Sequence, residues 1–395
     1  MRRFYFILLI ICVLLSGCQN QTNRGANEKN DFHTIDFVQC METEQPMLLS
    51  GIASSLEYLE LKTPEDVVIT GISKVVPFSE GLIVCSRREV CHFSMDGQFV
   101  RRIGAVGQGP GEYMMASDFE IDKKNKEIII KDFNSLLFYD FEGKYLRSRQ
   151  VRGMRSGVSD SVIWIGDFPM FRSKYISYAI TRNVADTVAN IPYIYYGVES
   201  VNDSNSPVAI GLSLFSTMFY CNNGLLYFKG TDSNDTIWEI SGTRAEPYAR
   251  IDMGKYKLPL EYEPLYSNDA FRKFGHEYWG VTSVIEDDRY FYLYSEIRRF
   301  EENNKPKYMI YDKKNKKGFT SKDNKDEKIK DDILGGPPVW PRWISDKYYI
   351  SAIESIELQE QIETGGYTPS SQLKELLSKI GEDTNQLIVL FHKNN

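Results

Sequence analysis

The sequence contains few of the residues that bind transition metals. Its 395 residues include 4 His and 6 Cys, and the histidines are scattered at His33, His92, His276 and His392. Neither CxxC nor HExxH occurs, so a zinc-type site has no support in the sequence. The GxSxG elbow and a Ser/His/Asp set are missing as well, and hydrolysis through an activated serine has no recognisable centre.

Long apolar runs are also missing. The longest, from Phe4 to Leu15, is shorter than the roughly 20 residues that span a bilayer. Two arginines precede it and "SGC" follows it, which gives a charged start, an apolar middle and a small-residue cleavage zone. We therefore predict that residues 1–17 are a removable export signal.

The end of this segment resembles the lipobox of bacterial lipoproteins. "LSGC" ends at Cys18, and in such proteins the cysteine is acylated with diacylglycerol and becomes the new N-terminus. The resemblance implies a cell-envelope protein that is anchored to a membrane by lipid on Cys18 rather than by a spanning helix. The alternative is a plain secretory signal with an incidental cysteine. The sequence leaves the membrane leaflet open.

The segment after Cys18 has the composition of a tether. Residues 19–31 contain no apolar side chain larger than alanine, and such a stretch buries too little surface to fold. The predicted organisation is a signal peptide at 1–17, a lipid-anchored flexible tether and lead-in at 18–54, and a folded domain at 55–395.

A basic excess is lacking too. The chain has 47 Lys and Arg against 54 Asp and Glu, a net charge of −7 that becomes −9 without the two arginines of the signal. Such a chain has no global basic footprint for nucleic acid, and we expect no nucleic-acid partner. Aromatic residues are abundant, with 25 Tyr and 22 Phe, and they favour strands.

Two cysteines flank the short segment "SRREV", which is typical of a hairpin tip. Cys85 and Cys91 should then lie opposite each other across the hairpin. In an oxidising envelope they could form a disulfide, although opposed strands hold their Cβ atoms somewhat too far apart. The alternative is two small buried hydrophobic residues.

The sequence repeats itself at an offset of 46 residues. "CHFSMDGQFVRRI" at 91–103 aligns with "LFYDFEGKYLRSR" at 137–149, with matching apolar positions and an acidic residue followed by glycine at each turn. Upstream, "GLIVCSRRE" aligns with "EIIIKDFNS" at the same offset. A repeated antiparallel unit of about 40 to 50 residues with four strands is typical of a β-propeller blade.

The second copy resembles an NHL-type blade. It has a glycine-rich lead-in, an inner strand "FEID", a strand "IIIKD" and the hairpin "FEGKY". With "NDTIWEI" at 234–240 and "GGPPVWP" at 335–341, the chain is similar over roughly residues 55–393 to six-bladed β-propeller lipoproteins of Gram-negative bacteria, known mainly as domains of unknown function. The resemblance implies an all-β, six-bladed propeller of four-stranded antiparallel blades.

The expected blades cover residues 67–104, 115–152, 158–200, 208–254, 279–322 and 335–393. The last blade lacks a final strand, and "LEYLELK" at 56–62 has strand alternation without a nearby partner. We predict that this N-terminal strand closes the ring, which removes a loose seam. "SSQLKELLSKIG" at 370–381 predicts one short helix inserted in the last blade.

The glycine-rich stretch "GAVGQGPGEY" at 104–113 is interpreted as a connector between blades. A phosphate-binding loop needs a following helix whose amides point at the anion, and a P-loop also needs Gly-Lys-Ser/Thr. Here "SDFEID" follows with the alternation of a strand. The glycines then serve a sharp turn from the first blade into the second.

Function in propellers is carried by loops, and the repeat places one set of them on a single face. The candidate ligand-binding residues on this face are Arg87, Arg88, Glu112, Tyr113, Asn134, Arg152, Arg155, Asp232, Arg298 and Arg299. The arginine pairs would suit carboxylated or sulfated ligands, and the alternative is solvated charge at hairpin tips. Trp279, Trp340 and Trp343 are either sugar-stacking platforms or residues packed between blades.

The sequence favours a non-catalytic binding or scaffolding module for a glycan, a peptide or an envelope protein. The alternative is an envelope hydrolase or lyase with calcium in the propeller channel, as in some six-bladed propeller enzymes. Asp118 and Asp132 could reach such an ion only if both side chains point inward. We predict no catalytic residue, resident metal or cofactor, and a calcium ion in the channel stays open as the alternative.

Overall fold

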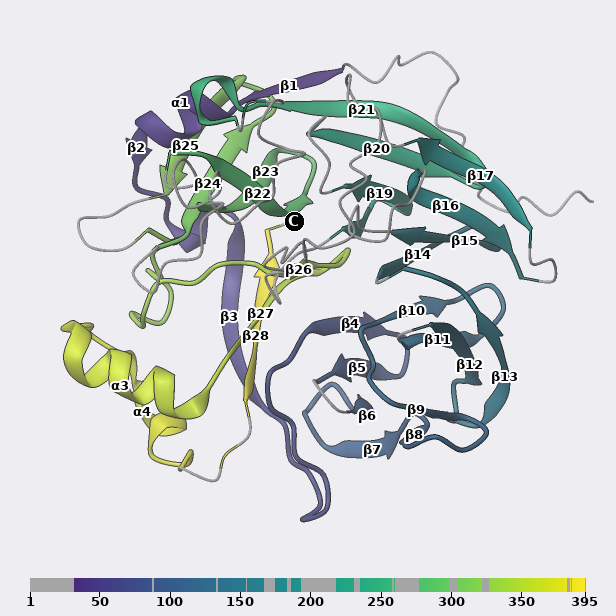
Figure 1. Cartoon of the computed structure of the whole chain (residues 1–395). Coiled ribbons are helices and arrows are strands. Elements are labelled where there is room, and N and C mark those ends of the chain that lie inside the picture. Colours follow the sequence, from purple (N-terminus) through teal and green to yellow (C-terminus); the bar gives the residue numbers. More distant parts are fainter. Residues whose placement is uncertain are drawn as a thin grey trace, which may run out of the picture. The chain divides into compact units, whose positions relative to one another are not determined.

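Six antiparallel blades form a propeller ring (Figure 1). The repeat predicted a propeller, and the resemblance implied six blades. The computed structural model describes residues 32–86, 89–132, 134–153, 155–166, 175–182, 186–192, 218–230, 235–257, 259, 277–297, 305–321, 327–381, 384 and 386–394. The chain divides into residues 1–31 and 32–395, and every described element belongs to the second unit.

Each blade has four consecutive strands, except the last. Blade 1 consists of β4 (Lys74–Phe78), β5 (Gly81–Cys85), β6 (Val90–Phe93) and β7 (Phe99–Arg102). Blade 2 consists of β10 (Asp118–Asp122), β11 (Glu127–Asp132), β12 (Ser135–Asp140) and β13 (Tyr145–Gln150). Blade 3 consists of β14 (Arg155–Ser159), β15 (Val162–Gly166), β16 (Tyr175–Thr181) and β17 (Thr187–Pro192). Blades 4 and 5 consist of β18 (Phe219–Asn222), β19 (Leu225–Lys229), β20 (Thr236–Ser241), β21 (Arg244–Asp252); and β22 (Trp279–Glu286), β23 (Tyr290–Ile297), β24 (Lys307–Asp312), β25 (Lys317–Ser321).

Blade 6 is completed by a strand from the other end of the domain. It contains β26 (Trp343–Ile344), β27 (Tyr348–Ile353), β28 (Leu387–Lys393) and β3 (Ala53–Glu60). β3 pairs antiparallel with β28, with Leu56 opposite Phe391. The predicted ring closure by an N-terminal strand is thus confirmed, and the last blade is joined to the first without an open seam.

The period-2 alternation of the strands explains the packing between blades. In β11, Ile128 and Ile130 pack against blade 1, whereas Ile129 packs against blade 3. All three are fully buried, and each such side chain stabilises the fold by roughly 1.5–3 kcal/mol. A blade therefore needs a neighbour on each side, and the closed ring supplies both.

The connector prediction for residues 104–113 is confirmed. This segment leads from β7 to β10 and contains a small parallel pair, β8 (Ala105–Val106) with β9 (Glu112–Tyr113). Gly104 and Gly111 have φ values of 68° and 79°, which only glycine adopts without strain.

The insertion in blade 6 contains two helices rather than the one predicted. α4 (Ser371–Leu377) is the expected helix, and the Ser370 hydroxyl accepts from Leu373 N at 3.3 Å as its cap. α3 (Ser355–Gly365) precedes it. Its sequence is mostly polar, and Leu358 is its one apolar side chain that is fully buried, so the helical period is weak.

The lead-in before β3 contains ordered elements that the sequence patterns did not predict. β1 (His33–Asp36) and β2 (Glu44–Gln45) pair parallel with β21 and β25, and α1 (Phe37–Glu42) lies between them. Phe37 and Cys40 of α1 are fully buried. Blades 4 and 5 thereby gain a fifth strand each.

The expected position of the two cysteines is wrong by one residue. Cys85 lies opposite Val90, and Cys91 lies opposite Val84. A shift of one residue turns a side chain to the other face of a sheet, so the cysteines pack on opposite sides of blade 1. Both are free and buried, which agrees with the alternative of two small hydrophobic residues.

The two faces of the ring carry different connections. The turns between the first and second strands of each blade lie on one face, which we call the turn face. Within the described residues, the crossovers between blades and the links between second and third strands lie on the other face, which we call the loop face. No helix in the described part of the chain is long and apolar enough to cross a membrane.

Candidate functional site

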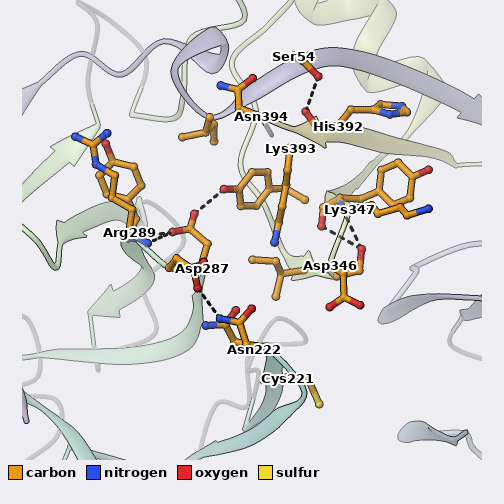
Figure 2. Close-up of a pocket in the computed structure, with 18 of the residues that line it drawn as sticks. Ser54, Cys221, Asn222, Asp287, Arg289, Asp346, Lys347, His392, Lys393 and Asn394 are labelled. Atoms are coloured by element: carbon orange, nitrogen blue, oxygen red, sulfur yellow. Dashed lines mark hydrogen bonds between the residues drawn. The ribbon is translucent and has the colours of Figure 1, made fainter. Parts of the chain in front are cut away.

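A cavity of about 770 Å³ opens on the turn face. It is formed by hairpin turns of blades 4, 5 and 6 and by the adjoining ends of β3 and β28 (Figure 2). We call it the turn-face cavity. Its lining comprises residues 51–52, 54, 221–223, 287–290, 344–349 and 392–394.

The blade 4 turn is fixed by its own sequence and by its neighbour. Asn223 and Gly224 have φ values of 50° and 75°, the conformation of a tight two-residue hairpin turn. The Asn223 side-chain amide donates to Asp288 Oδ1 at 2.5 Å. The turns of blades 4 and 5 therefore support each other at the cavity wall.

The blade 5 turn is organised around Asp287. One oxygen of this carboxylate accepts from the backbone N–H groups of Arg289 and Tyr290, at 2.6 and 2.7 Å. The other accepts from the hydroxyls of Tyr292 and Tyr349, at 2.9 and 2.5 Å. Asp287 is buried and occupied on both oxygens, so its role is to join blades 5 and 6.

Ser345 performs the corresponding task in the blade 6 turn. Its hydroxyl accepts from Tyr348 N at 3.1 Å, and its backbone N–H donates to Tyr348 O at 2.8 Å. This turn leaves Asp346 and Lys347 exposed at its tip. Within the described residues, no hydrogen bond or ion pair reaches the Asp346 carboxylate.

Lys393 lies at the centre of the cavity. Its backbone N–H donates to Lys347 O at 3.0 Å, and its ammonium lies 5.0 Å from the centre of the Tyr349 ring. In Figure 2 the side chain extends between Asp287 and Asp346. None of the described side chains forms a hydrogen bond or ion pair with its Nζ.

The electrostatics of Lys393 reflect two opposing effects. Partial burial lowers its pKa, and the negative charges of Asp287, Asp346 and Asp288 act in the opposite direction. Burial dominates, so the pKa stays below that of an ordinary lysine. The result is an amine that lies in the cavity beside the Tyr349 ring and forms no hydrogen bond or ion pair with a described residue.

A buried network of hydrogen bonds and one ion pair lies next to the cavity, around Glu286. The Glu286 carboxylate accepts from the hydroxyls of Tyr220 and Tyr248, at 3.2 and 3.0 Å, and pairs with the Lys313 ammonium. Burial raises the pKa of Glu286. These contacts join blade 4 to blade 5 directly beside Asp287 and hold the turns in register.

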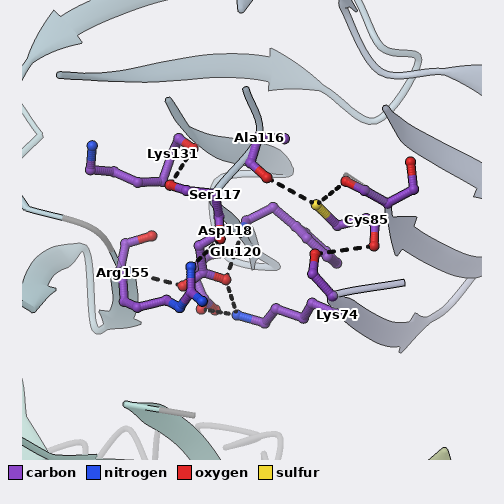
Figure 3. A network of polar contacts seen from close by, with 12 residues as sticks. Lys74, Cys85, Ala116, Ser117, Asp118, Glu120, Lys131 and Arg155 are labelled. Atoms are coloured by element: carbon purple, nitrogen blue, oxygen red, sulfur yellow. Dashed lines mark hydrogen bonds and ion pairs between the residues drawn. The ribbon is translucent and has the colours of Figure 1, made fainter. Parts of the chain in front are cut away.

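A second polar network lies at the inner strands of blades 1 to 3 (Figure 3). The Lys74 ammonium contacts Asp118 at 2.9 Å and Glu120 at 2.5 Å. Asp118 also accepts from Ser156 N at 3.1 Å, and the Arg155 guanidinium donates to Ser117 O. Burial raises the pKa of Glu120 to about 7.

The two carboxylates considered for a channel calcium do not converge. Asp118 is held by Lys74 and Ser156, whereas Asp132 accepts from the backbone N–H groups of Met114 and Met115, at 3.4 and 3.1 Å. In the part of the chain that the structure describes, no group of three or more His, Cys, Asp or Glu side chains could hold a metal ion.

The structure describes five of the candidate ligand-binding residues that the sequence predicted on the loop face. Tyr113 is buried and its hydroxyl accepts from Val90 N at 3.0 Å, while Glu112 accepts from Gly109 N at 2.8 Å. Asn134 and Arg152 are exposed, and Arg155 belongs to the second network. These five residues do not line the turn-face cavity.

The remaining candidate residues lie outside the described residues: Cys18, Arg87, Arg88, Asp232, Arg298 and Arg299. Of the three tryptophans, Trp279 and Trp340 are buried in the core of blades 4 to 6. Trp343 is partly buried, with the Arg342 guanidinium 4.4 Å from its ring centre. Trp279 and Trp340 are therefore residues packed between blades, and neither is a stacking platform open to a ligand.

The sequence patterns did not predict the cavity residues, because these residues lie in tight hairpin turns rather than in long loops. A signal was present nonetheless: "DDRY" at 287–290 aligns with "SDKY" at 345–348, both directly before a strand. The alignment places Asp288 with Asp346 and Tyr290 with Tyr348. An acidic, a basic and an aromatic residue thus follow one another at the same place in two turns, although a tight turn can form without such side chains.

The fold is shared with a solved protein. A crystal structure of a Bacteroides fragilis protein described as exported is 16% identical, with a TM-score of 0.69, over 92% of this chain and 100% of that one. The extracellular domain of a one-component system from B. thetaiotaomicron is 12% identical, with a TM-score of 0.37, over 67% of this chain and 29% of that one. The WD40 domain of Neurospora crassa Pan2 is 12% identical, with a TM-score of 0.38, over 69% of this chain and 73% of that one.

The first of these similarities supports the fold alone, and the other two are too distant to add to it. No curated protein matches the chain in sequence. Residues 32–392 match the family described as Domain of unknown function (DUF4934), and the chain therefore belongs to that family.

Proposed function

We propose that the protein is a lipid-anchored binding module of the cell envelope, and that its ligand enters the turn-face cavity. The observation that carries the proposal is that Asp346 and Lys393 both line this cavity, and that neither side chain forms a hydrogen bond or an ion pair with another described residue. The surrounding turns are fixed by their own hydrogen bonds. A cavity whose turns are held by hydrogen bonds, and which presents solvent-accessible charged groups, is suited to recognising a ligand.

The envelope location is supported by the N-terminal sequence. The export signal and the lipobox-like "LSGC" favour a lipoprotein anchored through Cys18, and the Bacteroides fragilis protein with the same fold is described as exported. The lipid anchor and the NHL-like character of the blades are parts of this proposal. Its ligand is a glycan, a peptide or an envelope protein.

The proposal assigns no catalytic residue. The best-placed carboxylate, Asp287, already accepts four hydrogen bonds, and Asp118 is paired with Lys74. The exposed Arg152 and Asn134 on the loop face stay a proposed second contact surface for an acidic partner.

A thermal-shift screen of the full-length protein in detergent tests this function. We expect stabilisation by one ligand class among oligosaccharides and peptides, and loss of that stabilisation in Asp346→Asn and Lys393→Met but not in Lys124→Met, a change in the exposed blade 2 turn. A large stabilisation by calcium that EDTA reverses would contradict the proposal and favour a metal-dependent enzyme. So would a ligand that binds equally well to all three variants.

A further inference from the structure

We propose that the turn-face cavity binds a neutral saccharide, whose hydroxyl groups bridge Asp346 and Lys393. This inference rests on the proposed binding function and names its ligand class. It begins from an unusual pairing in Figure 2: a carboxylate and an ammonium line one cavity, yet they form no ion pair with each other or with another described residue.

Hydroxyl groups match this arrangement chemically. A hydroxyl donates one hydrogen bond and accepts others, so neighbouring hydroxyls of a sugar can donate to a carboxylate and accept from an ammonium. Hydrogen bonds to charged groups are the stronger kind. Because Asp346 and Lys393 line the same cavity without forming an ion pair, a hydroxyl-bearing ligand between them would supply the hydrogen bonds that they do not make to each other.

The charge balance of the cavity disfavours ionic ligands. Asp287, Asp288 and Asp346 all act on the Lys393 ammonium, so an anion bound there would be close to three carboxylates. A cation beside Asp346 would in turn meet Lys393 and the neighbouring Lys347. Since neither sign is in excess, a polar ligand without net charge fits best.

Arg289 supplies the third positive charge of the lining, against Asp287, Asp288 and Asp346, and it is already paired. Its guanidinium donates to Asp312 Oδ2 at 3.3 Å and lies 4.8 Å from the centre of the Tyr290 ring. The arginine is thus directed along the blade 5 hairpin. This differs from the arginine pairs that the sequence predicts on the loop face, which would favour carboxylated or sulfated ligands.

The cavity also offers aromatic surface and sufficient space. Tyr290 and Tyr348 occupy equivalent places after their turns and both line the cavity, so a sugar bound there would meet aromatic side chains. The Arg289 guanidinium already lies over the Tyr290 ring, and the His392 ring contacts Tyr348 edge-on. The Asn222 and Asn223 amides add neutral polar contacts. A volume of about 770 Å³ is within the range of small-molecule sites, roughly 300–1,000 Å³.

Titration calorimetry of the full-length protein in detergent provides the test. The probes are neutral trisaccharides of glucose, galactose, mannose and N-acetylglucosamine, with trigalacturonic acid as the charged counterpart of galactotriose. We expect at least one neutral trisaccharide to bind and trigalacturonic acid to bind more weakly than galactotriose. Asp346→Asn and Lys393→Met should each weaken binding about ten-fold or more, because each removes a hydrogen bond to a charged group.

Matched controls separate a local from a global effect. Glu360→Gln, on the exposed face of α3, and Lys124→Met remove the same kinds of charge away from the cavity and should leave affinity unchanged. Lys393→Arg keeps the positive charge and should retain part of the affinity, which covers the case in which Lys393→Met unfolds.

Three outcomes would overturn the inference. Tighter binding of trigalacturonic acid than galactotriose would show an anion site, and full affinity in Asp346→Asn would show that the saccharide binds elsewhere. Binding of peptides alone, lost in the same variants, would also overturn it while leaving the proposed function intact. Absence of every cavity-dependent ligand would overturn both.

Discussion

Replacement of Asp287 by alanine should destabilise the whole ring, although the residue lies in a surface turn. Its carboxylate is the acceptor for two tyrosine hydroxyls, those of Tyr292 and Tyr349, and both rings are at most 4% exposed. A buried hydroxyl without an acceptor costs about 1–3 kcal/mol. Because the two hydroxyls can partly satisfy each other, we expect a loss of about 2–4 kcal/mol in the free energy of unfolding.

The assay is urea unfolding of the full-length protein, followed by tryptophan fluorescence. Asp287→Asn keeps one acceptor oxygen and should fall between wild type and Asp287→Ala. Asp288→Ala is the matched control: this neighbour is exposed and accepts one hydrogen bond, from Asn223, so its loss should cost no more than about 1 kcal/mol. Equal midpoints for Asp287→Ala and Asp288→Ala would refute the assignment of Asp287 as the joint between blades 5 and 6.

Three further predictions concern other parts of the domain. Because burial lowers the pKa of Lys393, an amine-selective reagent should modify it at a lower pH than exposed Lys124, and identical pH profiles by mass spectrometry would contradict this. Burial raises the pKa of Glu120 from 4.5 to about 7, so the native state keeps a proton that the unfolded state releases, and stability should fall as pH rises through this window. The melting temperature of Glu120→Gln should vary less over that range, and equal slopes would show that Glu120 does not titrate there. Leu56→Ala, in the closing strand, should lower the free energy of unfolding by about 2–5 kcal/mol, because Leu56 is buried. Glu57→Ala, on the exposed face of the same strand, should lower it little. Comparable urea midpoints for both variants would count against β3 as a buried part of blade 6.

The fold could be predicted because its determinants are local and repeated. The continuous apolar run in "EIIIKD" is typical of a strand buried on both faces, and the acidic-glycine turns set the hairpins. The closing strand was recognisable because 56–62 alternates without a neighbour to pair with. By contrast, β1 and β2 are short strands that pair parallel with distant residues, and no local pattern marks such pairing.

The candidate site was harder to predict because it depends on assembly. Asn223, Asp288 and Asp346 come from three separate turns, and the ring brings those turns to one cavity. The general tendency of loops to carry function predicts a site on the loop face instead. Tyr113 shows the limit of that argument: it follows a glycine-rich loop, as a binding residue would, but it is packed between blades 1 and 2.

The central claim, that ligands bind at the turns of blades 4 to 6, is tested most directly by a crystal structure of the full-length protein with its tightest-binding trisaccharide. Our account predicts that the saccharide lies between Asp346 and Lys393, with hydroxyl oxygens within hydrogen-bond distance of both side chains. A saccharide bound on the loop face beside Arg152, with the turn-face cavity holding none, would contradict it.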